Sequence, residues 1–341
     1  MRIIVDAMGG DNAPDAAVRG AVDAAKEFGV DITLCGDPQA IGRCIGEAGA
    51  SADGEHIRIA PASEVIEMED DPATAVRMKP DSSMAVGLRL LSSGEGDAFV
   101  SAGSTGALLS GATITVRRVR GIRRAALALV VPSAKGRFLL IDCGANAECT
   151  PEYLLQFAYM GSFYSKRILG VDEPRVNLLN IGAEECKGTP NRIEAWKALD
   201  EAGKAGRIDF RGNIEAREVM LGDTDVLVTD GFAGNIFLKT VEGTALFLLK
   251  ELKGAFLSSA KSKLGALLLK DSIAGIKSRV DISEVGGTIM LGLRKTVVKA
   301  HGSSDARAIR SAVMQAIGFV EADVIGEIER NVDVMKVAKE A

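Results

Sequence analysis

Short apolar runs alternate with stretches of helical spacing along almost the whole chain, and this alternation limits the possible folds more than any other feature. A helix between two strands lets those strands lie parallel in one sheet. The pattern therefore predicts an α/β protein with a largely parallel sheet, a Rossmann-like αβα sandwich. The expected strands are Ile3–Val5, Ile32–Cys35, Ile57–Ala60, Ala98–Ser101, Ala126–Val131, Phe138–Asp142, Val176–Ile181, Val226–Thr229, Ile289–Leu293 and Val297–Ala300.

The first expected strand ends in residues suited to a binding site. Asp6 closes the strand, and Gly9-Gly10 lets the backbone turn tightly and approach a ligand closely. Asp11 or Asn12 can cap the helix that follows. A strand, a glycine turn and a capped helix predict an anion or carbonyl site at the carboxyl end of the sheet.

Several later strand ends carry residues of the same kinds, which is more than structure alone requires. They combine glycines with hydroxyls, amides, a histidine and lysines, all of which can bind an anion or a carbonyl oxygen. The segment at 210–215 reads as another polar turn, and Ser303 or Ser304 can cap the last long helix. The candidate binding residues are Asp6, Gly9, Gly10, Asp11, Gly103, Ser104, Thr105, Gly106, Asn146, Asp230, Gly231, Lys239, Gly302, Ser303 and Ser304.

These segments together resemble the bacterial phosphate acyltransferases, the PlsX family. The run VDAMGGDNAP at 5–14 closely matches the start of that family, and HGSS at 301–304 resembles its signature. The turn at 101–107 resembles a family turn that has asparagine in place of Ser104. The match covers about residues 1 to 330, and it implies a fold similar to that of the phosphotransacetylases and the isocitrate and isopropylmalate dehydrogenases.

The resemblance implies an enzyme that transfers a long-chain fatty acyl group from acyl-acyl carrier protein to inorganic phosphate, giving acyl-phosphate for phospholipid synthesis. Such a reaction needs an anion site, donors for the thioester oxygen and accurate positioning, rather than a serine nucleophile or a metal. We expect phosphate at the turns 303–304 and 104–105, with Lys187 or Lys239 as its counter-charge. The expected catalytic residues are Lys187, Asn213, Asn235 and His301, with Asn146 as a further orienting amide.

Two other functions remain open. The first is a phosphotransacetylase that uses acyl-coenzyme A, and the second is a non-catalytic membrane scaffold that docks acyl carrier protein. A basic run at 117–124 holds five arginines and predicts a hinge, an anion-facing turn or a solvated helix end.

Composition bears on possible ligands, on disulfides and on the location of the protein. A net charge of −5 gives no reason to expect nucleic-acid binding. With two histidines and no C-x-x-C pair among five cysteines, we expect no metal, no cofactor and no disulfide. No signal peptide and no run of about 18 apolar residues is apparent, so we expect a cytoplasmic protein that does not span a membrane. We expect a single domain over residues 1–341.

Residues 245–280 predict an amphipathic helical hairpin that interrupts this domain. It has two apolar helical faces, and between 250 and 279 it holds seven basic residues against two acidic ones. Such a segment can lie on an anionic membrane or pack in a homodimer, and both can hold. The resemblance favours peripheral membrane association, close to a membrane-embedded glycerol-3-phosphate acyltransferase. The expected membrane contacts are Phe256, Leu257, Leu264 and Leu268.

Overall fold

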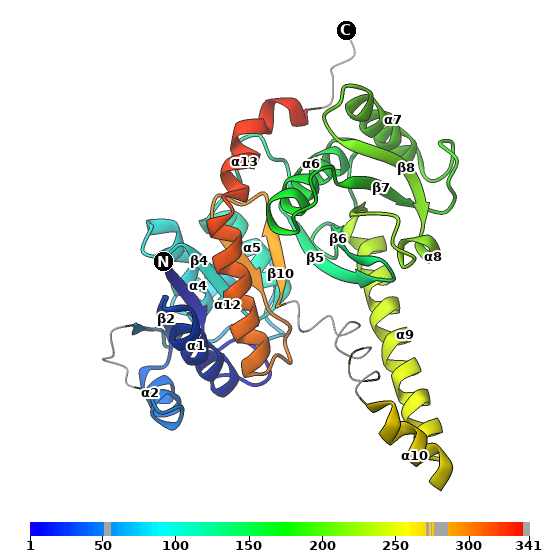
Figure 1. Cartoon of the computed structure of the whole chain (residues 1–341). Coiled ribbons are helices and arrows are strands. Elements are labelled where there is room, and N and C mark those ends of the chain that lie inside the picture. Colours follow the sequence, from blue (N-terminus) through cyan, green and yellow to red (C-terminus); the bar gives the residue numbers. More distant parts are fainter. Residues whose placement is uncertain (51–55, 271–272, 274, 276–285, 337–341) are drawn as a thin grey trace.

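The fold is a mixed sheet between layers of helices, seen in a computed structural model that describes residues 1–50, 56–270, 273, 275 and 286–336 (Figure 1). Across these described residues one sheet of eleven strands has the order β3-β2-β1-β4-β11-β10-β5-β6-β9-β7-β8. All ten expected strands are present, with ends that shift by one or two residues. The strands are β1 Arg2–Asp6, β2 Asp31–Gly36, β3 Ile57–Pro61, β4 Ala98–Ser101, β5 Ala126–Ser133, β6 Gly136–Ile141, β7 Arg175–Asn180, β8 Asp209–Glu215, β9 Val226–Val228, β10 Thr288–Leu291 and β11 Thr296–Lys299.

The sheet is mostly parallel, as expected, but its direction reverses in the middle. Strand β11 is parallel to β4, while β10 is antiparallel to both β11 and β5, and β5 is antiparallel to β6. Strands β6, β9, β7 and β8 are parallel to one another. They therefore run opposite to β1, β2, β3, β4 and β11, so the carboxyl ends of the two halves come from opposite directions.

The helices cover both faces of the sheet and bury two apolar layers. One layer packs under α1, α2, α6, α7, α12 and α13, with Val18, Phe157 and Ile309 among its fully covered side chains. The other packs under α4, α5 and the start of α9, with Leu88 and Leu108. The helices are α1 Asp15–Phe28, α2 Pro38–Glu47, α3 Ala75–Met78, α4 Ser83–Ser93, α5 Thr105–Thr115, α6 Pro151–Ile168, α7 Pro190–Lys204, α8 Ala216–Val219, α9 Gly231–Leu257, α10 Ala260–Leu268, α12 Ala306–Glu321 and α13 Val324–Asn331, followed by the 3₁₀ turn η2 Val332–Met335.

Two expected helix caps are wrong. Helix α1 begins after Pro14 without a side-chain cap, so neither Asp11 nor Asn12 caps it. The Asn12 amide instead donates to the carbonyl oxygens of Ser303 and Ser304, both at 3.2 Å. Helix α12 is capped by Asp305, whose carboxylate accepts from the Ala308 N–H, and not by either serine. The Asn12 contacts therefore hold the turn after β1 against the turn after β11.

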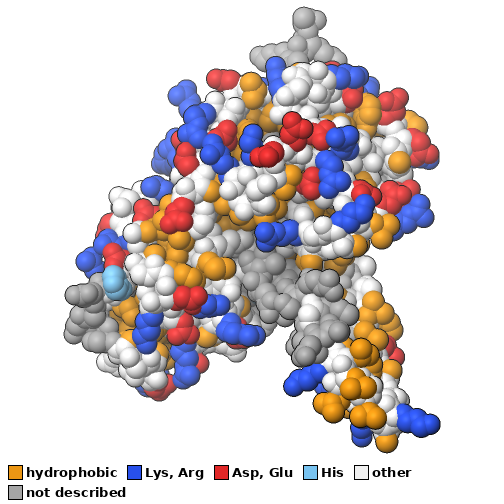
Figure 2. Space-filling view, in the orientation of Figure 1, with side chains coloured by type: hydrophobic (Ala, Val, Ile, Leu, Met, Phe, Trp, Pro, Cys, Tyr) orange, Lys and Arg blue, Asp and Glu red, His pale blue; other side chains and the backbone are white. Residues whose placement is uncertain are grey.

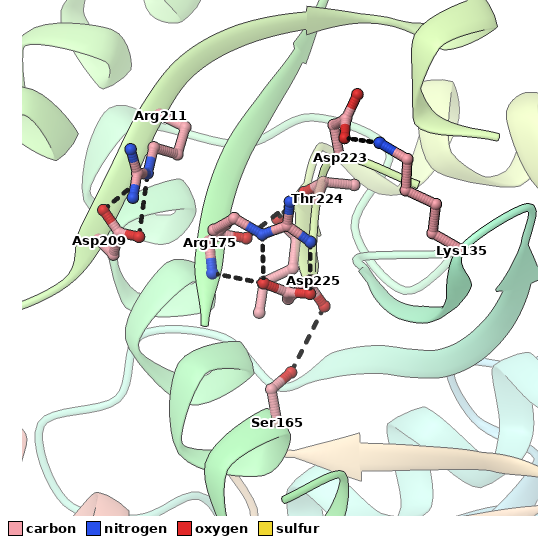
Figure 3. Close-up of polar contacts among 9 residues, drawn as sticks. Lys135, Ser165, Arg175, Asp209, Arg211, Asp223, Thr224 and Asp225 are labelled. Atoms are coloured by element: carbon pink, nitrogen blue, oxygen red, sulfur yellow. Dashed lines mark hydrogen bonds and ion pairs between the residues drawn. The ribbon is translucent and has the colours of Figure 1, made fainter. Parts of the chain in front are cut away.

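The starts of β7 and β9, by contrast, are closed by ion pairs (Figure 3). Arg175 donates to Asp225 from its backbone N–H at 2.9 Å and from Nε and Nη2 at 2.8 and 3.0 Å. Nearby, Lys135 pairs with Asp223 at 2.5 Å. The Arg175–Asp225 pair therefore ties the start of β7 to the start of β9.

Helices α9 and α10 project from the body as a hairpin (Figure 1). The turn expected at 258–259 is present, and Ser259 caps α10 by accepting from the Ser262 N–H. The first helix of the hairpin, α9, begins at Gly231, which is earlier than the expected start at residue 245. Much of the expected end, at 271–280, lies outside the described residues. By length and composition alone, α9 is long and apolar enough to cross a membrane. This is weak evidence for a membrane span, because core helices of soluble proteins pass the same test.

Candidate functional site

A cavity of about 810 Å³ lies where the two halves of the sheet meet. It joins the turns after β1, β4 and β11 to the turn after β6 and to one face of α9, with β5 between them. Strand β5 contributes Leu127 and Leu129. The polar and glycine residues that line it are Gly10, Asp11, Glu67, Gly103, Ser104, Thr105, Gly144, Asn235, Lys239, Glu242, Gly286, Gly287, Thr288, Lys299, His301, Gly302 and Ser304.

The turn after β1 is held against the turn after β4 by a buried carboxylate. Asp6 accepts hydrogen bonds from the Ser101 hydroxyl at 2.7 Å and from the Met8 N–H at 3.2 Å. Burial raises the pKa of Asp6, although these donors oppose the rise. A Cβ on Gly9 would lie 2.5 Å from Asp6 Oδ2 and 2.7 Å from the Gly103 nitrogen, so only glycine allows the two turns to pack this closely.

Helix α5 presents an uncapped N-terminus to the cavity. Ser104 stands at the N-cap position, but its side chain makes no capping hydrogen bond. The first N–H groups of a helix have no intrahelical partners, and the helix dipole favours an anion beside them. Ser104 and Thr105 both line the cavity. The start of α5 therefore offers backbone donors to a negatively charged ligand.

A buried lysine lies beside this helix end. Lys299, at the end of β11, is only 8% exposed and lines the cavity. Its Nζ donates to the carbonyl oxygen of Ala102 at 3.2 Å and to that of Ala300. Burial lowers the pKa of Lys299 to about 8, while Asp6 and Asp11 act to raise it. An anion in the cavity would favour the charged form of this lysine.

The turn after β11 fixes the ring of His301. The Ser303 N–H donates to Nδ1 at 3.2 Å, and the Ser303 hydroxyl lies 2.8 Å from the same nitrogen. Because a backbone N–H can only donate, Nδ1 is an acceptor and the neutral ring carries its proton on Nε2. His301 is exposed and lines the cavity, so Nε2–H is available to a ligand.

The opposite side of the cavity is organised by Asp142. Its buried carboxylate accepts from the N–H groups of Leu127, Gly144, Ala145 and Asn146 at 2.7 to 3.2 Å, and from the Asn146 amide at 2.9 Å. Burial raises the pKa of Asp142, and these donors oppose the rise. Asp142 thus shapes the turn after β6 against the start of β5.

The structure brings together ten of the residues expected from the sequence in this cavity. They are Gly10, Asp11, Gly103, Ser104, Thr105, Asn235, Lys239, His301, Gly302 and Ser304. Asp6, Gly9 and Ser303 support the same turns through the contacts above. Lys239 pairs with Glu242 at 2.7 Å, so its charge is already balanced.

The remaining expected residues lie elsewhere. Gly106 and Asn146 line a second, smaller cavity next to the first. Asp230 caps α9 and pairs with Arg192 at 2.5 Å, and the adjoining Gly231 N–H donates to Asn146 at 2.7 Å. These contacts give Asp230 and Gly231 a supporting place at the start of α9.

Lys187 and Asn213 are in neither cavity lining. Lys187 follows β7 and is 4.0 Å from Glu184. Asn213 lies within β8, where the sequence suggested a turn, and its amide donates to the Glu184 carbonyl at 2.8 Å. Asn213 therefore holds the loop that carries Lys187.

Sequence reasoning missed Lys299 and Asp142 as site residues. A single lysine inside the apolar run Val297–Ala300 was the signal for the first, since an unpaired lysine is rarely buried without a function. Among the described residues no group of three or more His, Cys, Asp or Glu side chains could hold a metal ion.

Comparisons with known proteins place this chain in a family. Residues 1–327 match the family model described as fatty acid synthesis protein. The chain is 45% identical to the phosphate acyltransferase of Clostridioides difficile, covering 97% of this chain and 96% of that protein. It is 44% identical to the phosphate acyltransferase of Oceanobacillus iheyensis, covering 98% of each.

Solved structures show the same fold at lower identity. A phosphotransacetylase from Streptococcus pyogenes superposes with a TM-score of 0.64 at 18% identity, covering 96% of this chain and 94% of that one. A phosphotransacetylase from Staphylococcus aureus gives a TM-score of 0.60 at 15% identity, covering 94% and 93%. These likenesses confirm the fold group expected from the sequence.

Proposed function

Because the chain belongs to the fatty acid synthesis protein family, the phosphate acyltransferases, we propose that the cavity at the meeting of the two sheet halves is where it transfers an acyl group to phosphate for lipid synthesis. One observation carries this assignment of the site. Buried Lys299 and the uncapped start of α5 face the same cavity, which large apolar side chains also line.

Phosphate binds between Lys299 and the start of α5. The ammonium group supplies the charge, and the N–H groups near Ser104 and Thr105 supply directed donors. The turn at 301–304 closes the third side with the Ser304 hydroxyl and the His301 ring. We assign the counter-charge to Lys299 and not to Lys187 or Lys239, because Lys187 is outside the cavity lining and Lys239 is paired.

The acyl thioester lies across the middle of the cavity. Apolar side chains there can hold a long hydrocarbon chain, which favours a fatty acyl donor over the acetyl group of a phosphotransacetylase. Asn235 and the Nε2–H of His301 are donors for the carbonyl oxygen as it becomes negative. The large apolar side chains of the lining are Met8, Val65, Ile66, Met68, Leu127, Leu129 and Leu238.

The reaction needs one displacement. An oxygen of phosphate forms a bond to the thioester carbon, the carbon–sulfur bond breaks, and its electron pair leaves with the thiolate, which then takes a proton. A thiol has a pKa of about 8.5, so its thiolate is a good leaving group and needs little help from an acid. The protein's contribution is to position the two substrates and to stabilise the oxyanion.

A cysteine nucleophile does not fit the site. Cys143 lines the cavity, but burial, together with the nearby charge of Asp142, raises its pKa well above the ordinary thiol value. The thiolate needed for attack is therefore strongly disfavoured. Phosphate itself is the nucleophile.

We place the enzyme at the cytoplasmic face of a membrane as a homodimer, held there by the hairpin of α9 and α10. Large apolar side chains on the hairpin face solvent, and they gather with lysines at its tip (Figure 2). A membrane-embedded glycerol-3-phosphate acyltransferase would receive the labile acyl-phosphate there. Leu257, Leu264 and Leu268 are 56%, 60% and 80% exposed, and Phe256 is half-buried beside them.

The test is to mix the protein with palmitoyl-acyl carrier protein and phosphate, and to trap acyl-phosphate as its hydroxamate. Acetyl-coenzyme A in a parallel reaction distinguishes a phosphotransacetylase, and excess chelator should leave the rate unchanged. Hydroxamate from the palmitoyl donor and none from acetyl-coenzyme A supports the proposal. Product from acetyl-coenzyme A alone, or a rate lost in chelator and restored by Mg²⁺, overturns it.

A further inference from the structure

A second cavity of about 370 Å³ lies on the other side of the start of α5. The two cavities adjoin at two points along the chain. Thr105 lines the first and Gly106 the second, and likewise Gly144 lines the first and Ala145 the second. The walls of the second cavity are mostly apolar, with Ser110 and two arginines among the exceptions. The two cavities therefore share the start of α5 and the turn after β6 as walls.

The two arginines of this cavity are Arg118 and Arg124. The Arg124 guanidinium lies 5.8 Å from the centre of the Tyr153 ring, and Arg118 donates to the carbonyl oxygen of Arg123. In the part of the chain that the structure describes, no carboxylate forms an ion pair with either of them. Arginines without a carboxylate partner present paired N–H donors that match a phosphate group.

The positive charge extends beyond the cavity. Arg117 and Arg120 are exposed, and the Arg294 N–H donates to the Arg117 carbonyl at 3.0 Å, so exposed Arg294 lies beside them. Among the described residues, only Arg123 of the 117–124 run has an ion pair, with Glu152 at 3.0 Å. The whole chain carries −5, so this surface differs sharply from the average.

Building on the proposed acyl transfer, we infer that the second cavity takes the phosphopantetheine arm of the acyl donor and that the arginines around it dock an acidic carrier protein. Arg118 and Arg124 bind the phosphate of the arm, and the arm passes Gly106 and Ala145 to bring the thioester into the first cavity. Arg117, Arg120 and Arg294 lie outside the cavity lining. They give a positive surface wider than one arm needs, which fits an acidic protein.

The experiment measures binding of the acyl carrier protein and binding of its isolated arm in separate titrations. Fluorescently labelled palmitoyl-acyl carrier protein and labelled palmitoyl-phosphopantetheine are titrated with the full-length protein in low salt, and anisotropy gives each Kd. Arg120→Glu, outside the cavity, should raise the Kd for the carrier protein about tenfold or more and leave the Kd for palmitoyl-phosphopantetheine unchanged. Arg124→Glu should weaken both ligands. Arg43→Glu, an exposed arginine on α2 without an ion pair among the described residues, is the matched control and should change neither.

Turnover gives an independent reading. The KM for palmitoyl-acyl carrier protein should rise in Arg120→Glu while the phosphate KM stays as in the wild type. The inference is overturned if Arg120→Glu binds carrier protein as tightly as Arg43→Glu does, or if Arg124→Glu binds the arm normally. Because the titration needs no turnover, it still tests the docking surface if the wild type makes no acyl-phosphate, which is the separate failure of the proposed function.

Discussion

Lys299, at the end of β11, donates a hydrogen bond from Nζ to the carbonyl oxygen of Ala102, 3.2 Å away at the end of β4. This contact places an ammonium group at the turn that leads into α5, two residues before the N-cap at Ser104. A backbone carbonyl is a weak partner for a charged group that is 8% exposed. An anionic ligand would complete the surroundings of Lys299.

The depressed pKa of Lys299 predicts how phosphate binding depends on pH. The value is about 8, so the ammonium form is complete well below pH 8 and is lost as the pH rises through it. The phosphate KM of the wild type should therefore rise between pH 7.5 and 9.5. Lys299→Arg keeps its charge over that range, so its KM should stay nearly flat. Identical profiles for the two proteins would exclude this lysine as the titrating group.

Gly9 should not tolerate a side chain. Its Cβ would lie 2.7 Å from the Gly103 nitrogen and 2.5 Å from Asp6 Oδ2, so Gly9→Ala must push the two turns apart. We expect kcat/KM to fall at least tenfold, and the free energy of unfolding to fall by about 1 to 3 kcal/mol. Gly42→Ala in α2 is the control, because nothing lies within 4 Å of its Cβ. If both variants keep wild-type activity, the close approach of these turns is not needed.

Asp142 should matter chiefly for stability. Asp142→Ala leaves the N–H groups that now converge on its carboxylate without an acceptor, which should cost about 3 kcal/mol or more in the free energy of unfolding. Asp223→Ala removes an exposed carboxylate whose pairing with Lys135 is screened by solvent, so it should lower the free energy of unfolding far less. Urea unfolding of both variants gives the comparison. Equal losses would show that the carboxylate of Asp142 does not hold the turn together.

Much of the fold could be predicted because buried strands appear in the sequence as apolar runs. Strand β8 was missed because it lies at the edge of the sheet, where polar residues such as Arg211 and Asn213 are tolerated. The reversal of the sheet follows from the hairpin of β5 and β6, in which Ser133 pairs with Gly136 across a two-residue turn. The local signal was the short connection: six residues between the expected strands Ala126–Val131 and Phe138–Asp142 are too few for a crossover between parallel strands.

The sequence predicts the kind of turn that forms the candidate site, but not which of the similar turns come together there. The glycine turns after β1, β4 and β11 do line one cavity through Gly10, Gly103 and Gly302, together with the hydroxyls of Ser104, Thr105 and Ser304. Lys187 and Asn213 were grouped with them because their strand ends look alike in sequence. Strands β7 and β8 are the last two of the sheet, separated from β6 by β9, and this position carries them out of the lining, a consequence of sheet order that no local pattern reveals.

The hairpin predicts reversible membrane binding. The wild type should float with anionic liposomes, and Leu257→Glu and Leu268→Glu should both reduce flotation because each puts a charge on an exposed apolar position. Leu221→Glu is the control, since Leu221 is 59% exposed but lies outside the hairpin. Sedimentation shows whether each variant keeps its oligomeric state. Variants that stay dimeric and float like the wild type would exclude the hairpin as the anchor.

The most direct test of the central claim is the phosphate KM of Lys299→Gln compared with that of Lys187→Ala, each measured at saturating palmitoyl-acyl carrier protein. We expect a rise of at least tenfold for Lys299→Gln, because the variant loses the counter-charge of the bound anion, and a distinctly smaller rise for Lys187→Ala. A larger effect at Lys187, or an unchanged phosphate KM in Lys299→Gln, would contradict the placement of phosphate beside Lys299.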